Sequence, residues 1–159
     1  MTPAIKQLQK HHIAHTLHAY EHDASSDQSY GAEAAAALGL PPSQVFKTLV
    51  IEDSNADLAV AIVPVSGTLN LKSLASSLRL KKVSMADKSR VSAVTGYVLG
   101  GVSPLGQKKT LRTVIDESAF EHSVIYVSAG KRGLDVALSP TDLLMVCKAK
   151  QAPIANPDS

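Results

Sequence analysis

Hydrophobic and polar positions alternate along the chain in short runs, and their period switches repeatedly between that of a helix and that of a strand. Helical spacing, capping residues and glycine stops predict helices over 2–12, 30–39, 71–78 and 86–94, and a last helix that starts after Ser139. Extended alternation and short apolar runs predict strands at 15–20, 45–52, 58–65, 81–85, 97–101, 110–116, 123–128 and 134–139.

Turn residues indicate how these strands connect. DSNAD (53–57) separates two apolar runs as a hairpin turn does, and AGKRG (129–133) predicts a tight connection between the last two strands. Hairpins mixed with helices predict an α+β fold with one strongly twisted, mostly antiparallel sheet. We expect one domain over 1–150, followed by a flexible tail over 151–159, where QAPIANPDS has little apolar content.

Composition narrows the class of protein. The 159 residues are 45% hydrophobic, which is enough to form a core without cross-links. The single cysteine excludes an internal disulfide framework. The chain starts without a charged and apolar leader and has no apolar run of membrane-spanning length, which predicts a soluble intracellular protein. A net charge of +2 permits an anionic partner but lacks the concentrated basic field of a typical nucleic-acid binder.

Histidine and cysteine offer two chemical hypotheses, and we favour the structural interpretation of both. Five of the six histidines lie between His11 and His22, but helix and strand geometry spreads them over several faces, so we expect no metal site. Cys147 follows LLMV on the last predicted helix, where a small buried apolar side chain fits better than an activated nucleophile.

Two charged residues interrupt strands that are otherwise apolar. Lys47 in VFKTLVIE is either a lysine whose ammonium reaches water at a strand end or a desolvated cation beside a pocket, which would stabilise a developing negative charge. Asp135 in LDVALS either faces solvent or points inward, where it would need a partner. Spacing alone leaves both alternatives open.

The run LGGVSPLGQKK (99–109) has unusual backbone freedom. It lacks the spacing of a Walker loop or a dinucleotide-binding loop, which argues against a phosphate cradle. A tight turn or bulge is one interpretation, and a backbone that approaches a substrate carbonyl closely is the other.

Several motifs together resemble one family of proteins. MTPAIKQL, HAYEHD, FKTLVIE, NLKSLA, GYVLGGVSPLGQKK and VIYVSAGKRGLDVAL occur in order from Met1 to about Cys147. This combination resembles the YbaK/EbsC family of freestanding aminoacyl-tRNA editing proteins, and within it the Cys-tRNA(Pro) deacylase branch. The resemblance implies a compact α+β domain with a mixed, partly barrel-like sheet flanked by helices.

The resemblance also implies an activity, which needs no cofactor. The enzyme would hydrolyse the ester between a misattached amino acid, above all cysteine, and the terminal adenosine of proline tRNA, an error that packing alone discriminates poorly. In this branch the substrate's own thiol attacks the ester and leaves as a thiolactone, so no protein nucleophile is required. There are two alternatives. Water could hydrolyse the tRNA ester of another small amino acid, alanine or serine, or the chain could be a non-catalytic module that binds tRNA or a synthetase.

Site residues and partners follow by the same resemblance. Lys47 is expected near the ester, with Tyr20 and Asp135 orienting the substrate. The other expected pocket residues are Tyr30, Thr48, Gly100, Gly101, Ser128 and Gly130. The residues that flank the two glycine-containing loops are either contacts to tRNA phosphates or ordinary solvated surface charges. They are Lys108, Lys109, Lys131 and Arg132. The expected partners are proline tRNA and prolyl-tRNA synthetase, without DNA or membrane, for a cytoplasmic monomer.

Two positions depart from the family pattern. Many relatives have glycine where this chain has Ala129, and left-handed backbone would cost alanine about 1 kcal/mol or more, so we predict a negative φ there. Tyr30 stands where phenylalanine is common, which keeps a ring but adds a hydroxyl to the pocket. We expect Gly100 and Gly101 to border a pocket that Lys47 and Asp135 share. We expect Lys108 and Lys109 to lie outside that pocket.

Overall fold

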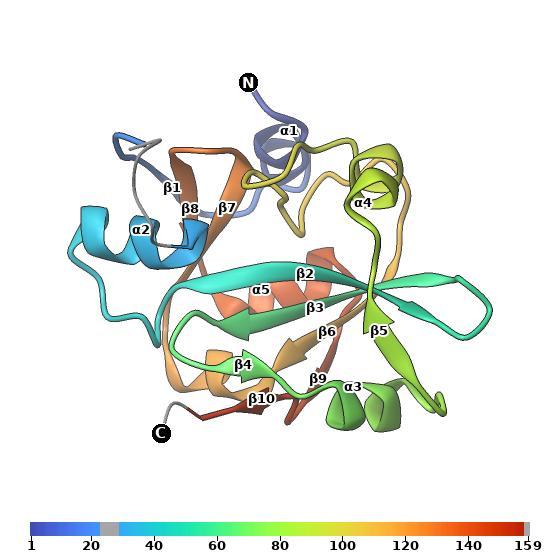
Figure 1. The fold of residues 1–159 in the computed structure, drawn as a ribbon. Helices are drawn as coiled ribbons and strands as arrows, with labels where there is room; N and C mark the ends of the chain where they lie inside the picture. Colours follow the sequence, from blue (N-terminus) through green and yellow to red (C-terminus); the bar gives the residue numbers. More distant parts are fainter. Residues whose placement is uncertain (23–28, 158–159) are drawn as a thin grey trace.

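The computed structural model describes residues 1–22 and 29–157 (Figure 1). Their helices are α1 (Pro3–Lys10), α2 (Tyr30–Leu38), α3 (Leu71–Leu78), α4 (Lys88–Thr95), η1 (Glu117–Glu121, a 3-10 helix) and α5 (Pro140–Val146). Their strands are β1 (Thr16–Ala19), β2 (Phe46–Asp53), β3 (Leu58–Pro64), β4 (Thr68–Leu69), β5 (Val83–Met85), β6 (Arg112–Asp116), β7 (Ile125–Lys131), β8 (Leu134–Leu138), β9 (Lys150–Ala152) and β10 (Ala155–Asn156).

The helix boundaries follow from local capping chemistry. Side chains of Ser29, Asn70 and Ser139 accept hydrogen bonds from the first turns of α2, α3 and α5. Gly39 ends α2 in left-handed backbone with φ 68°. The predicted helices are therefore confirmed within about two residues at each end, which is the usual uncertainty of helix ends. No helix of the described residues is long and apolar enough to cross a membrane.

The strands form three sheets instead of the single sheet expected. A five-stranded sheet has the order β5-β2-β3-β6-β9, a three-stranded sheet the order β1-β8-β7, and β4 pairs with β10. The pairs are antiparallel except β3–β6 and β6–β9, so the α+β, mostly antiparallel prediction is confirmed. None of these sheets closes into a barrel within the described residues; a lone bridge between Val45 and Tyr126 connects the two larger sheets.

Both faces of the five-stranded sheet are covered, which explains why β3 is apolar along its whole length. Val60 and Ile62 of β3 pack in one core cluster, with residues of α1, β7, β8 and α5. Ala59, Ala61 and Val63 point the other way and pack with α3 and Ile154. In Figure 1 the β1-β8-β7 sheet stands at an angle to this sheet, between α2 and α1.

The strand predicted at 97–101 is wrong. Gly96 and Gly100 have φ of 82° and 89°, so left-handed backbone brackets the run and the chain turns back on itself. Tyr97 fills the interior, and its hydroxyl donates a hydrogen bond to the Leu105 carbonyl at 2.6 Å. Tyr97 therefore packs from a loop, whereas Val98 and Leu99 are exposed.

Part of the segment expected to form a tail contains strands. Residues 151–152 belong to β9 and 155–156 form β10, while 158–159 lie outside the described residues. One carboxylate oxygen of the buried Asp116 accepts hydrogen bonds from the amides of Ile154 and Ala155, both at 2.9 Å. The Ile154 side chain is fully buried. Asp116 thus fixes a segment whose own apolar content is too low to predict its docking.

We predict that Asp116→Ala lowers the free energy of unfolding by about 2–4 kcal/mol, because two buried amides lose a charged acceptor. Asp57→Ala, an exposed carboxylate, is the control and should change it by less than about 0.5 kcal/mol. Urea unfolding measures both variants, and amide hydrogen exchange at Ile154 should accelerate only in the first. Equal stability of the two variants would contradict the role of Asp116.

Candidate active site

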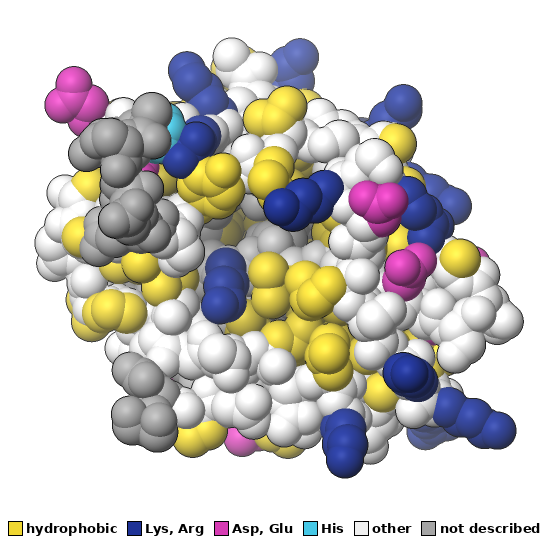
Figure 2. Space-filling model, viewed as in Figure 1, with side chains coloured by type: hydrophobic (Ala, Val, Ile, Leu, Met, Phe, Trp, Pro, Cys, Tyr) yellow, Lys and Arg dark blue, Asp and Glu magenta, His cyan; other side chains and the backbone are white. Residues whose placement is uncertain are grey.

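One pocket brings together most of the residues expected at the site. Its cavity of ≈ 330 Å³ lies between the end of β1, the start of α2, the first half of β2, the 99–102 loop and the β7–β8 hairpin. Figure 2 shows it as a hollow near the middle of this face, bordered mainly by hydrophobic side chains. The expected residues that line it are Tyr20, Tyr30, Lys47, Thr48, Gly100, Ser128 and Asp135.

The remaining lining is largely apolar and was missed from the sequence. The one sequence signal for this wall of the pocket was a leucine that precedes two glycines, in VLGG. Apolar side chains surrounding a few polar groups are typical of small-molecule sites. These additional residues are Ser29, Gly31, Ala34, Val45, Phe46, Leu49, Leu99 and Val102.

Lys47 belongs to β2 and is half-buried at the pocket wall. Burial lowers the pKa of its ammonium below the ordinary value, because desolvation disfavours the charged form. Lys47 and Asp135 line the same pocket but form no ion pair. Of the two alternatives for this lysine, the structure therefore places it beside a pocket rather than extended into water.

Asp135 belongs to β8 and lies opposite Ser128 of β7 and His18 of β1. The residue is only 5% exposed, and burial raises the pKa of its carboxyl to about 6. It therefore points inward, and its charge is costly unless a ligand supplies a cation.

Tyr20 lies next to this carboxyl. Its backbone amide donates a hydrogen bond to the Gly133 carbonyl at 2.9 Å, which fixes the end of β1 against the β7–β8 turn. Burial, and then the negative charge of Asp135, raise the pKa of the Tyr20 hydroxyl. The hydroxyl therefore stays protonated at neutral pH and is available as a hydrogen-bond donor.

The two neighbouring glycines have different positions. Gly100 lines the pocket with φ 89°, and a Cβ there would lie 3.0–3.1 Å from the Tyr30 ring. Gly101 is buried outside the lining, and its amide donates to the Val98 carbonyl at 3.0 Å. The expectation that both glycines border the pocket is wrong for Gly101, whose amide is already used within the loop.

The β7–β8 hairpin contributes one lining residue and one structural glycine. Ser128 lines the pocket, and its hydroxyl accepts a hydrogen bond from the Gly130 amide at 3.1 Å. Gly130 lies outside the lining in a bulge, with φ 97°, where a Cβ would be 2.6 Å from the Tyr97 ring. The negative φ predicted for Ala129 is confirmed, because this fully buried residue is absent from the left-handed positions.

Unpartnered polar atoms gather around the pocket. Within the described residues, the buried side-chain atoms without a hydrogen-bond partner are Thr48 Oγ1, Arg132 Nε and Glu33 Oε2. Thr48 lines the pocket, Arg132 stacks on a lining residue, and Glu33 raises the pKa of Tyr20 through its charge. Buried polar groups are rarely left without partners, so their concentration here is typical of a site that receives a polar ligand.

Glu33 is a residue that the sequence analysis missed. It is the single acidic residue of the alanine-rich helix α2, it is 5% exposed, and its Oε1 lies 2.7 Å from His22 Nδ1. The described residues contain no group of three His, Cys, Asp or Glu side chains placed to hold a metal ion. His22 is therefore placed as a partner of a carboxylate.

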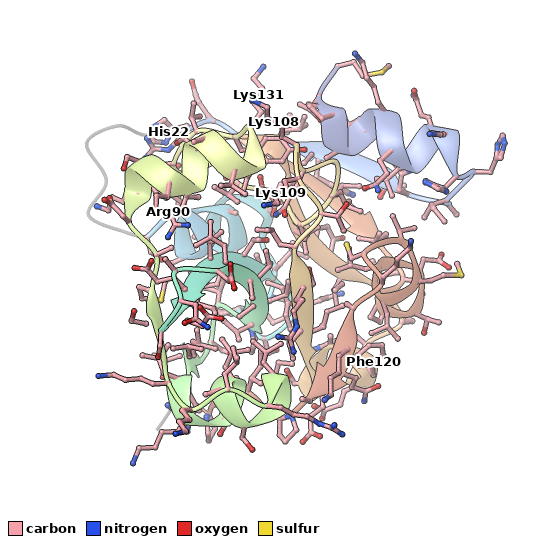
Figure 3. The ribbon with its side chains drawn as sticks, turned by 90° about the vertical axis from the view of Figure 1, so that its right-hand side faces the viewer. His22, Arg90, Lys108, Lys109, Phe120 and Lys131 are labelled. Carbon is pink, nitrogen blue, oxygen red and sulfur yellow. The ribbon has the colours of Figure 1, made fainter. Side chains whose placement is uncertain are left out.

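The expected tRNA contacts fall into two groups. Lys108, Lys109 and Lys131 are exposed and lie outside the pocket lining, as predicted for the first two. Figure 3 shows all three on the same upper part of the molecule. Arg132 is partly buried, and its guanidinium carbon lies 4.0 Å from the centre of the Tyr30 ring.

Cys147 is remote from the pocket lining and packs against the main core cluster. Burial raises the pKa of its thiol to about 12, and the thiol donates to the Pro104 carbonyl at 3.4 Å. A protonated, buried thiol is a poor nucleophile.

Most of the chain matches a known protein family. Residues 27–146 match the aminoacyl-tRNA editing domain. An Enterococcus faecalis protein named "Putative Cys-tRNA(Pro)/Cys-tRNA(Cys) deacylase EbsC" is 36% identical over 155 residues, which cover 98% of this chain and 93% of that protein. A proline-tRNA ligase of Trichlorobacter lovleyi is 33% identical over 90 residues, 57% of this chain and 16% of that enzyme.

Two solved structures share the fold. One, a hypothetical protein, has a TM-score of 0.86 at 23% identity and covers 98% of this chain and 100% of its own. The other, described as "a putative trans-editing enzyme for prolyl tRNA synthetase", has a TM-score of 0.79 at 21% identity and covers 98% and 99%. The fold and pocket define a small α+β domain with a cavity between its two larger sheets. With the family match over most of its length, the chain belongs to the aminoacyl-tRNA editing domain family.

The raised pKa of Asp135 predicts a pH dependence of stability. The folded carboxyl titrates at about 6 and the unfolded one near 3.8, so the folded state holds an extra proton between these values. The free energy of unfolding should therefore fall as pH rises from about 4 to about 6, relative to Asp135→Asn, which cannot ionise. Chemical unfolding of both proteins across this range is the measurement. Parallel pH curves would show that Asp135 is not desolvated.

Proposed function

We propose that this chain is an aminoacyl-tRNA deacylase and that its substrate is cysteine esterified to proline tRNA. The observation that carries the proposal is the pocket in which a half-buried lysine and a buried aspartate face the same cavity without pairing. An aminoacyl ester has complementary groups, since its ammonium is cationic and its carbonyl gains negative charge during reaction. The family to which the chain belongs supports the same activity.

The pocket size supports recognition of the aminoacyl end alone. A cavity of ≈ 330 Å³ is near the lower end of small-molecule sites, so it accommodates a small amino acid and its ester, with the tRNA outside. Asp135 would accept the substrate ammonium, and the Tyr20 hydroxyl beside it would donate a hydrogen bond to the substrate. Thr48 Oγ1 has no hydrogen-bond partner among residues 1–22 and 29–157 and would find one in the ligand.

Lys47 would stabilise the charge that develops on the ester. Its ammonium is partly desolvated, so its interaction with an anionic oxygen is stronger than that of a fully exposed lysine. Gly100 would form the wall beside the ester, because its missing side chain leaves room next to Tyr30. These are the groups we assign to the reaction.

The nucleophile would come from the substrate. The cysteine sulfur bonds to the ester carbonyl carbon, the bond to the ribose oxygen breaks, and the thiol proton passes to that oxygen. The thiolactone that leaves is then opened by water. This route suits the described residues, because the hydroxyls of Ser128 and Thr48 line the pocket without a hydrogen-bonded base.

The surface beside the pocket would meet the nucleic acid. We assign phosphate contacts to the exposed Lys108, Lys109 and Lys131, which lie outside the lining. Because the net charge is only +2, we propose that prolyl-tRNA synthetase assists delivery of the tRNA to this cytoplasmic protein.

Deacylation assays with Cys-, Ala- and Ser-tRNA(Pro) test this function. We predict selective loss of the cysteinyl ester, and a decrease in kcat of about 100-fold or more for Lys47→Ala. Lys72→Ala, at an exposed position of α3, is the control and should match the wild type. Loss of alanine or serine instead of cysteine would assign the other substrate with water as the nucleophile. Binding of Cys-tRNA(Pro) without ester loss would leave only a binding module.

A pair of glycine substitutions separates pocket geometry from backbone strain. Gly100→Ala and Gly39→Ala both place a side chain at positive φ, 89° and 68°, and each should cost about 1 kcal/mol of stability. A Cβ contacts the Tyr30 ring only at Gly100, whereas Gly39 has open space. Deacylation should therefore fall only in Gly100→Ala. Equal kcat values for the two variants would exclude Gly100 from the substrate wall.

A further inference from the structure

Arg132 lies in the turn between β7 and β8, next to a lysine of a different character. The Lys131 side chain is exposed, whereas Arg132 is partly buried and stacks over the Tyr30 ring at 4.0 Å. Its buried Nε has no hydrogen-bond partner in the part of the chain that the structure describes. A planar guanidinium suits stacking on an aromatic ring, and a lysine ammonium does not replace it there. The two adjacent cations therefore have different surroundings.

The contacts of this turn form a closed set around the pocket mouth. Arg132 contacts the Tyr30 ring, and the hydroxyl-bearing end of that ring lies 3.0–3.1 Å from the Cβ position of Gly100. The Cβ position of Gly101 lies 3.0–3.2 Å from the backbone of Lys131 and Arg132. Three segments distant in sequence thus support one another, and a side chain at either glycine would separate them.

Tyr30 is the residue of α2 that this set holds. It is the first residue of the helix, it lines the pocket, and it is 36% exposed. The rest of α2 is mostly alanine, whose small side chains provide little surface for anchoring the helix. Contacts made by the Tyr30 ring therefore contribute a large part of the interaction between this end of α2 and the β7–β8 turn.

We infer that Arg132 is a positioning residue: it holds the Tyr30 ring against Gly100 and thereby fixes the pocket wall beside the aminoacyl ester. The inference rests on the proposed function of the pocket. It gives Arg132 a role different from that of the exposed Lys131, because a stacked and partly buried guanidinium is not free to follow tRNA phosphates. Arg132 also lies close enough to Tyr20 to lower its hydroxyl pKa, against the effect of Asp135.

Steady-state deacylation of Cys-tRNA(Pro) at two salt concentrations tests this role. Arg132→Lys and Arg132→Ala should lower kcat about 3- to 30-fold, the range of cation–π energies, and keep the salt dependence of KM. Lys131→Ala should instead raise KM and weaken its salt dependence. Tyr30→Phe keeps the ring and should lower kcat less than Tyr30→Leu, which should lower it as Arg132→Ala does. The double variant Arg132→Ala/Tyr30→Leu should be no slower than either single variant.

The inference would be overturned if the decreases in kcat of the two single variants multiplied in the double variant. It would also be overturned if Arg132→Ala kept the wild-type kcat and changed KM and its salt dependence as Lys131→Ala does. A second measurement needs no turnover. Amide hydrogen exchange in the first turn of α2 should accelerate in Arg132→Ala and stay at the wild-type rate in Lys131→Ala. If the exchange rate in Arg132→Ala is unchanged, the positioning role is excluded, whether or not the protein hydrolyses aminoacyl-tRNA. If exchange accelerates in Arg132→Ala but the wild type is inactive, only the proposed function is refuted.

Discussion

Two opposite charges that face one cavity without pairing with each other define this molecule. The β7–β8 hairpin packs beside the start of β2, so Asp135 and Lys47 face one cavity. Burial raises the pKa of Asp135 and lowers the pKa of Lys47, so it favours the neutral form of each side chain. A direct ion pair would satisfy both groups, yet the structure keeps them apart. This arrangement costs stability, which is expected where a ligand supplies the missing partners.

The surrounding fold maintains that separation. Asp135 is fixed by strand register between Ser128 and His18, and Lys47 by the β2–β3 pairing opposite Val63. The pocket walls depend on tertiary contacts of a different kind, such as the Tyr30 ring against Gly100. Rigid strands therefore carry the charged groups, while a loop and a helix start shape the space between them.

The sequence predicted the features that depend on local chemistry. Capping by Ser139 and the left-handed stop at Gly39 determine helix ends without tertiary contacts. The strand predicted at 97–101 failed because two left-handed glycines override its apolar composition. The C-terminal strands could not be predicted, since they depend on a carboxylate of Asp116 from a distant strand. At the site, spacing left the direction of Lys47 and Asp135 open, and Glu33 and Arg132 gain their surroundings only through folding.

The central claim is that the buried carboxylate is complementary to the ammonium of an aminoacyl ester. The most direct measurement is an NMR titration of Asp135, with and without a cysteinyl-adenosine analogue that carries a non-hydrolysable amide. The carboxyl pKa should start at about 6 in the free protein and fall on binding, because the ammonium stabilises the carboxylate. A carboxyl pKa that stays unchanged while the analogue binds would contradict this account.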